Sequence, residues 1–138
     1  MNTKNPHAKS CIRVYNNEIV KVSDPVVVID LMGEAQTDCG CSLTLKKDHI
    51  QVNTPGLYHF SADVEFSGKT DSVIQLYVDG QSIPSAVASI PSCSSSGLVH
   101  IETELCIRTC RMNHPKVYLE ASDVTEISKV NLGALKLA

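Results

Sequence analysis

The sequence predicts an all-β protein built as an antiparallel sandwich or jelly roll. No segment keeps apolar residues at i, i+3, i+4 and i+7 over three turns, so no amphipathic helix is expected. Instead, about eight to ten short runs of β-type residues are separated by turn signals, as is typical of all-β domains. The 138 residues are 43% hydrophobic, which suits one domain with a substantial core.

The clearest strand lies in residues 51–66, QVNTPGLYHFSADVEF. After Gly56, apolar side chains occupy the even positions from Tyr58 to Phe66, and mostly polar side chains occupy the odd positions. This period of two predicts a strand with one face on the core and the other facing water or a partner. Pro55 presets φ and Gly56 tolerates a positive φ, so the pair predicts a type II turn before the strand.

Later runs continue this pattern. A break is expected at residues 67–71, and residues 73–78 then form a strand that ends at Asp79-Gly80, a hairpin signal. Residues 99–107 show the most regular alternation in the chain, and residues 117–121 predict a further strand. The runs together account for most of a sandwich.

Two segments, residues 26–31 and 130–137, are apolar on both faces. Such strands suit the inner layer of a sandwich or a subunit interface. The apolar parity of the second segment changes near Gly133, which indicates either a bulge or burial on both sides. The candidates for the core or for a subunit interface are Val26, Val28, Leu31, Val130, Leu132, Leu135 and Leu137.

The first part of the chain is more polar. We interpret residues 1–24 as an N-terminal arm or docking segment, although residues 11–15 and 18–22 could also be short strands. Residues 25–138 then form the jelly-roll domain, with a loop expected at residues 33–41. The chain is therefore expected to be one domain with an arm.

Charge and cysteine content limit the classes of function. A net charge of −3 with scattered lysines and arginines argues against a nucleic-acid partner. No apolar run is long enough to span a membrane, and the first residues lack the apolar stretch of a signal peptide. The six cysteines are therefore expected to be reduced thiols of a protein made in the cytoplasm, with disulfides or a metal site as alternatives.

The order of these parts resembles the tumour necrosis factor (TNF) and complement globular-head superfamily. Pro55, Gly56, Tyr58 and Phe60 match the Pro-Gly-x-Tyr-x-Phe segment typical of that family, and Asp79 and Gly80 match its turn after a strand. The resemblance covers roughly residues 26–137 and implies a ten-stranded, TNF-like jelly roll that assembles as a tight homotrimer. The C-terminal NLGALKL is most similar to bacterial and bacteriophage members.

Sites of chemistry are sparse. His59 and His100 lie on the polar faces of their strands, so three copies around a three-fold axis could ligate a metal, with Glu102 as a supporting carboxylate. Solvated or interface-packed histidines are the alternative. Glu102 and Glu104 share a strand face, as glutamate pairs on strands routinely do. No nucleophile, metalloprotease or phosphate-loop motif is present, so we expect no catalytic residues and no cofactor.

These observations favour a non-enzymatic structural or adhesion protein. We expect a bacteriophage virion component, such as a capsid decoration, a head fibre or a tail-associated trimer, made in the host cytoplasm. Its partners would be its own copies, other virion proteins bound through residues 1–24, and a host-surface glycan or protein. The alternatives are a secreted signalling ligand of the cytokine or complement type and a carbohydrate-binding module.

Overall fold

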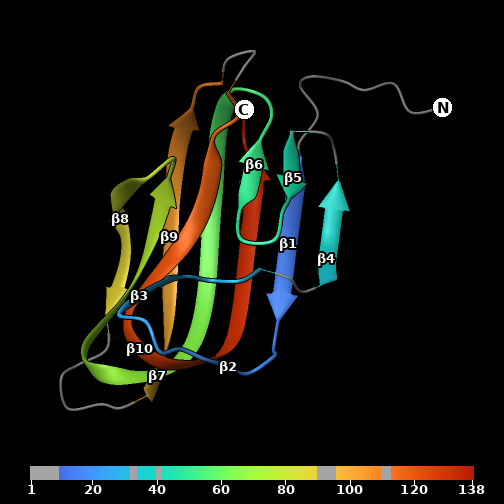
Figure 1. The fold of residues 1–138 in the computed structure, drawn as a ribbon. Helices are drawn as coiled ribbons and strands as arrows, with labels where there is room; N and C mark the ends of the chain where they lie inside the picture. The colour runs from blue at the N-terminus through green and yellow to red at the C-terminus, as the bar shows by residue number, and fades with distance from the viewer. Residues whose placement is uncertain (1–9, 32–33, 40–41, 90–95, 110–112) are drawn as a thin grey trace.

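The protein is an all-β sandwich, as seen in a computed structural model that describes residues 10–31, 34–39, 42–89, 96–109 and 113–138. These residues form antiparallel strands (Figure 1). The strands are β1 (Cys11–Asn16), β2 (Val20–Lys21), β3 (Val26–Val28), β4 (Glu34–Cys39), β5 (Leu43–Leu45), β6 (Ile50–Val52), β7 (Gly56–Val78), β8 (Gln81–Ser89), β9 (Ser96–Ile107) and β10 (Lys116–Lys136).

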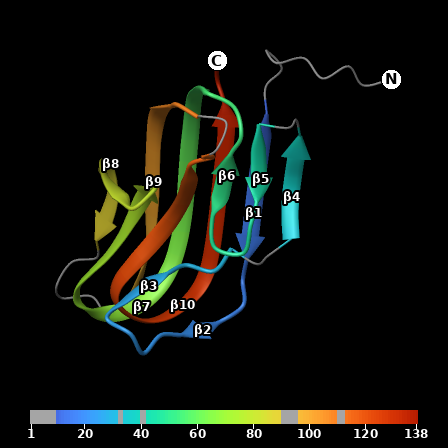
Figure 2. The same ribbon diagram turned by 45° about the horizontal axis from the view of Figure 1, so that its top comes forward.

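Two long strands organise the sandwich. β7 and β10 are 23 and 21 residues long, and they pair with each other from Tyr58–Lys136 at one end to Val78–Val117 at the other. The first half of β7 and the second half of β10 form one layer with β9, β1 and β4. The remaining halves form the other layer with β8, β3, β6 and β5 (Figures 1 and 2).

The passage between the layers is a bend in this two-stranded ribbon. The β7–β10 register shifts several times between Ser122 and Lys129, and Asp123 has a φ of 58°. The Ser72 hydroxyl donates a hydrogen bond to the carbonyl oxygen of Asp123 at 2.6 Å, which ties the two strands together at the bend. The predicted break at residues 67–71 is wrong as a strand end, because β7 continues through it. It does coincide with an irregularity in the ladder, where the pairing passes from Gly68–Val124 directly to Val73–Ser122. The strands expected at 117–121 and 130–137 belong to the single strand β10, which ends at Lys136.

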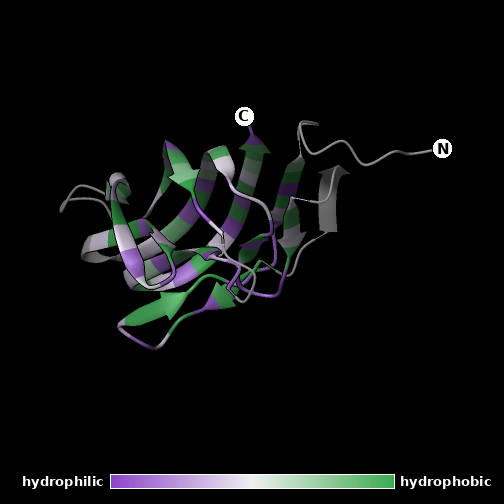
Figure 3. Ribbon diagram, turned by 90° about the horizontal axis from the view of Figure 1, so that it is seen from above, coloured by the Kyte–Doolittle hydropathy of each residue, from purple (hydrophilic) through white to green (hydrophobic). Residues whose placement is uncertain are grey.

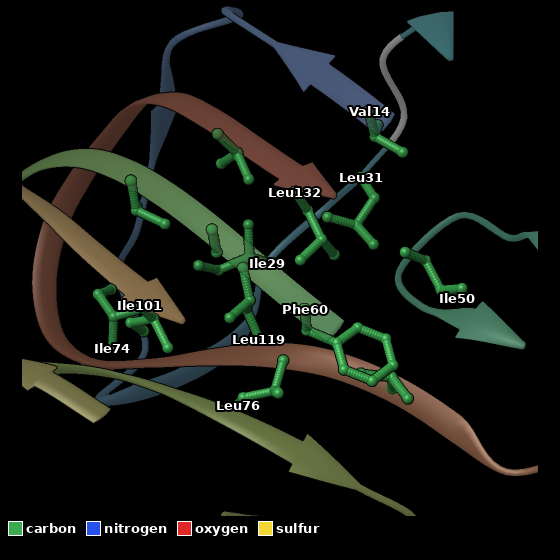
Figure 4. Packing of buried hydrophobic residues seen from close by; sticks show 14 of the residues in the cluster. Val14, Ile29, Leu31, Ile50, Phe60, Ile74, Leu76, Ile101, Leu119 and Leu132 are labelled. Carbon is green, nitrogen blue, oxygen red and sulfur yellow. The ribbon is translucent and has the colours of Figure 1, made fainter. Parts of the chain in front are cut away.

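The core lies between the layers and follows the predicted alternation. Tyr58 and Phe60 are 0% and 1% exposed, and their rings stack with centroids 6.2 Å apart. The Tyr58 hydroxyl donates to the carbonyl oxygen of Thr54 at 2.6 Å, so this buried polar atom is satisfied. Figure 3 shows hydrophilic and hydrophobic residues alternating along the strands. Figure 4 shows both layers contributing to the core, with Phe60, Ile101 and Leu132 from one and Ile74, Leu76 and Leu119 from the other.

The two predicted turn elements differ in outcome. Asp79 and Gly80 have positive φ angles of 49° and 83° and join β7 to β8 as a two-residue hairpin, which confirms the prediction. Gly56 has no such φ, so the predicted type II turn is wrong. A side chain is excluded there because a Cβ would meet the Ala138 carbonyl oxygen and would lie 2.8 Å from Cε of Lys136.

The N-terminal segment belongs to the sandwich. β1 lies between β4 and β10, and its residues Ile12 and Val14 are 2% and 1% exposed. The boundary predicted between residues 24 and 25 is therefore wrong, and the alternative of short strands holds for this region. Residues 1–9 of the predicted arm lie outside the described residues. The loop expected at residues 33–41 contains β4, which pairs with β1.

Gly56→Ala should lower the free energy of unfolding by about 1–3 kcal/mol, because the added methyl overpacks the junction between Gly56 and the chain end. Urea denaturation measures this change. Ser82→Ala, at an exposed position of β8, is the control and should change stability by less than about 0.5 kcal/mol. Equal stability of both variants would contradict the steric account.

Candidate self-association face

One outer surface of the sandwich combines charged, small and apolar side chains. It consists of the outward-pointing residues of β1, the second half of β10, the first half of β7, and β9; we call it the β1–β9 face. Its register places Arg13 opposite Gly133, Gly133 opposite Ser61 and Ser61 opposite Glu102. The face includes Arg13, Leu57, His59, Ser61, Asp63, Glu65, His100, Glu102, Glu104, Cys106, Lys129, Asn131, Gly133, Leu135 and Leu137.

Two histidines and three carboxylates form a network on the β7–β9 part of this face. Glu102 bridges both imidazoles, with one oxygen 3.0 Å from Nε2 of His59 and the other 3.4 Å from Nε2 of His100. Nδ1 of His100 lies 2.8 Å from Asp63, and Nδ1 of His59 lies 3.8 Å from Glu104. Cross-strand pairing explains the network, because His59 faces Glu104 and Asp63 faces His100 in the ladder.

The network favours the charged forms of His100 and Glu102. Hydrogen bonds to Asp63 and then to Glu102 raise the pKa of His100, and hydrogen bonds from His100 and His59 lower the pKa of Glu102. The stabilisation from His100 is present below its ordinary pKa of 6.5 and is lost as the pH rises through the raised pKa. The stabilisation from Glu102 is present above the ordinary glutamate pKa of 4.5 and is lost as the pH falls through the lowered pKa of Glu102. The network therefore stabilises the fold most in weakly acidic solution.

The predicted metal ligands His59 and His100 do lie near each other, since both contact Glu102. Among the described residues, however, no group of three or more His, Cys, Asp or Glu side chains is arranged to hold a metal ion. Each imidazole is already engaged with carboxylates of its own chain. A metal shared by three copies stays a prediction with no support from the single chain.

A hollow of about 360 Å³ lies beside this network. It forms because Gly133 and Ser61 contribute little or no side chain at the centre of the face, between Arg13 on β1 and Glu102 on β9. Nη1 of Arg13 donates to the amide oxygen of Asn131 at 2.7 Å. A Cβ on Gly133 would lie 2.7 Å from Nη2 of Arg13, so the guanidinium lies directly over this glycine. The hollow is therefore built from small residues under an arginine.

The predicted core or interface residues divide into three groups. Leu31, Val130 and Leu132 are in the core, at 0%, 3% and 0% exposure. Leu135 and Leu137 are half-buried and point outward on the β1–β9 face, next to Leu57. Val26 and Val28 are 51% and 39% exposed on the opposite layer, so they lie neither in the core nor on this face.

The register of β10 resolves the parity change near Gly133. Pairing with β7 runs without a shift from Lys129 to Lys136, so no bulge is present there. Lys136 instead takes a core-side position, where its ammonium donates to the Thr54 hydroxyl at 3.3 Å. Burial on both sides is the correct alternative.

The cysteines depart from the expected reduced state. Cys11 is disulfide-bonded, and the backbone of Cys39 lies directly opposite it in the β1–β4 ladder. Cys106 is a free, exposed thiol on the β1–β9 face. The expectation that all cysteines are reduced is therefore wrong for Cys11.

Structural comparison identifies the fold. No protein-family model matches the chain, and a search of curated protein sequences finds no relative. The chain in a crystal structure of murine APRIL is similar, with a TM-score of 0.69 at 16% identity over 94% of this chain and 100% of that chain. The PRD1 vertex protein P5 is similar with a TM-score of 0.63 at 16% identity, over 94% and 97% of the two chains. The globular domain of the zebrafish complement 1qA protein is similar with a TM-score of 0.66 at 14% identity, over 95% of this chain and 98% of that chain.

These similarities define the fold. The chain has the jelly-roll fold shared by TNF ligands, complement globular heads and a viral vertex protein. The resemblance carried by Pro55, Gly56, Tyr58 and Phe60 is thereby confirmed at the level of the fold. It extends to β1, because the match covers more of the chain than residues 26–137.

Sequence reasoning found part of the face and missed the rest. It placed His59, His100 and Glu102 on polar strand faces. It does not single out Arg13, because residues 11–15 are compatible with either an arm or a short strand. It missed the hollow because nothing in the sequence aligns Gly133 with Ser61; only the β7–β10 register does so.

The His100 imidazole should titrate with a pKa above 6.5 in an NMR pH titration. Asp63→Asn should lower that pKa, since the hydrogen bond to Asp63 is its main cause. Glu65→Gln is the control, because Glu65 lies on the same strand but 4.0 Å from Lys129. An unchanged His100 pKa in Asp63→Asn would contradict the network.

Proposed function

We propose that the protein is a non-enzymatic structural or adhesion module that assembles as a homotrimer through the β1–β9 face. The observation that carries the proposal is the combination on this face of half-buried leucines, a central hollow and charges of both signs. A surface of this kind suits a partner that fills the hollow and covers the leucines. The similarity in fold to TNF-type domains supports the choice of a second and third copy as the partner.

The distribution of charge favours a ring of copies. Arg13 lies on the β1 side of the face, and Glu102 and Glu104 lie on β9 at the other side. Among the described residues, the Arg13 guanidinium bonds the neutral Asn131 and pairs with no carboxylate. If each copy turns its β1 side to the β9 side of the next, opposite charges meet at every contact. Such a heterologous contact closes into a ring when the rotation is three-fold.

Within this proposal, the trimer is a bacteriophage virion component. The support is the similarity in fold to the PRD1 vertex protein P5 over nearly the whole of both chains. Residues 11–16 of the predicted docking segment are strand β1 of the sandwich, so they do not form a separate arm. The described residues contain no helix long and apolar enough to cross a membrane.

A secreted ligand of the cytokine or complement type is the second candidate. The observation that favours it is the disulfide at Cys11, since disulfides form and persist in oxidising surroundings. Murine APRIL and the complement 1qA domain share the fold and support this candidate. Mass spectrometry of purified virus particles separates the two candidates, because only the virion role places the chain in the particle.

Light scattering on the purified chain should give a mass of about 45 kDa, three times the 14.9 kDa of one chain. The mass should remain the same with and without a reducing agent, because the proposed contacts are non-covalent. A monomer at micromolar concentration would contradict the homotrimer.

Ser61→Arg should convert this trimer to monomer, because the long charged side chain fills the hollow of the β1–β9 face. Gln75→Arg is the matched control on the same strand, since Gln75 is half-buried in the other layer. Light scattering reports the mass, and circular dichroism confirms the β-sheet content of both variants. Trimers of equal mass in both variants would place the interface elsewhere.

A further inference from the structure

The layer opposite the β1–β9 face carries a second recess. β3 and β6 pair with the same side of β10, β3 at residues 120–122 and β6 at residues 116–117. Neither strand pairs with Tyr118, so an opening remains between the end of β3 and the start of β6. A hollow of about 200 Å³ lies there, lined by Val28, Asp48, His49, Lys116 and Tyr118.

The apolar wall of this hollow is aromatic. Tyr118 and Tyr77 face each other across β10 and β7, and their rings stack with centroids 5.5 Å apart and planes 7° from parallel. This stacking supports the Tyr118 ring from behind and limits its rotation. Burial is the main cause that raises the pKa of Tyr118, so its hydroxyl stays protonated and can donate a hydrogen bond. Val28, which is 39% exposed, adds a methyl surface to the wall.

The polar side of the hollow offers an acceptor and a donor. Asp48 lies 2.8 Å from Nδ1 of His49, and the hydrogen bond from His49 is the main cause that lowers the pKa of Asp48. The carboxylate therefore stays ionised and accepts hydrogen bonds. Among the described residues, the Lys116 ammonium has no salt bridge within 4.0 Å. Its backbone is held by Asp79, whose side chain accepts from the Lys116 amide at 2.9 Å.

The chemistry of these groups indicates which class of ligand the hollow can bind. The lining itself carries one carboxylate, Asp48, and one ammonium, Lys116, and this pairing of opposite charges favours a neutral ligand over an anion or a cation. An aromatic face beside a carboxylate and an ammonium suits a molecule with an apolar C–H face and several hydroxyl groups. The volume lies below the roughly 300–1,000 Å³ of sites for drug-sized molecules, so it suits one ring. A pyranose meets all three conditions.

We propose that the hollow formed by Val28, Asp48, His49, Lys116 and Tyr118 binds a single neutral pyranose unit of a surface saccharide. The C–H face of the sugar packs on Tyr118, its hydroxyl groups donate to Asp48, and Lys116 donates to another sugar oxygen. This assignment deepens the adhesive role proposed above and rests on it for its biological meaning. The hollow is built from one chain, however, so sugar binding does not require the trimer.

The position of the hollow also suits multivalent binding. It lies on the layer away from the β1–β9 face, so a trimer joined through that face leaves three copies of the hollow open. Single-ring affinities are weak, because few atoms make contact. Three linked sites raise the effective affinity for a dense glycan surface without any new contact.

The test is an NMR titration of the isotope-labelled full chain with four neutral probes: the methyl glycosides of glucose, galactose, mannose and N-acetylglucosamine. We expect at least one probe to shift the amide signals of residues 48, 49, 116 and 118, with a Kd in the millimolar range, roughly 1–10 mM. Shifts confined to other residues, or no shift with any of the four probes, would overturn the proposal.

Variants make the test specific. Asp48→Asn removes the charged acceptor at an exposed position and should weaken binding about tenfold or more. Tyr118→Leu removes the aromatic wall and should do the same; matching circular dichroism and thermal midpoints show that it is folded. Asp24→Asn, another exposed carboxylate, is the matched control and should bind as the native chain does. Unchanged affinity in Asp48→Asn would overturn the site. The light-scattering result has no bearing on this outcome, so the two proposals fail separately.

Discussion

The pairing of β7 with β10 is the constraint on which the rest of the structure depends. Both strands are long enough to pass through two layers, and they remain hydrogen-bonded to each other in both. Every other strand except β4 and β5 pairs directly with one of them. The bend, held by the hydrogen bond from Ser72 to Asp123, folds this ribbon over the core. Because the two strands bend together, their register determines which side chains meet on each outer surface.

Both outer surfaces follow from that register. In one layer, β10 places Gly133 beside Ser61 of β7, and the absence of side-chain bulk leaves the hollow beneath Arg13. In the other layer, the same strand places Tyr118 beside Tyr77, and the two short strands β3 and β6 leave the Tyr118 ring partly exposed. One ribbon thus supplies a surface suited to other copies of the chain and a separate surface suited to a small polar ligand.

The sequence pattern predicts the positions of the histidine network but not its contacts. Period-two alternation places His59, His100 and Glu102 on outward faces, which is correct. It does not say which residue of β9 opposes which residue of β7, and that register makes Glu102 the bridge between the two histidines. The sequence does not predict the Tyr118 hollow at all. Asp48 and Tyr118 lie far apart in the chain, and only the folded structure brings them together.

The sequence by itself determined the all-β class, the core face of the strand that begins at Gly56, the Asp79-Gly80 hairpin and the similarity to TNF-type jelly rolls. These features depend on neighbouring residues, since side-chain alternation and turn dihedrals are local properties. The tertiary structure decided that β1 is an inner strand, that β7 and β10 run unbroken through both layers, and that Leu135 points outward while Leu132 points inward. Those outcomes depend on long-range strand pairing. Polar residues between two apolar runs are equally compatible with a loop or with a bend in one strand, and only the partner strand decides between them.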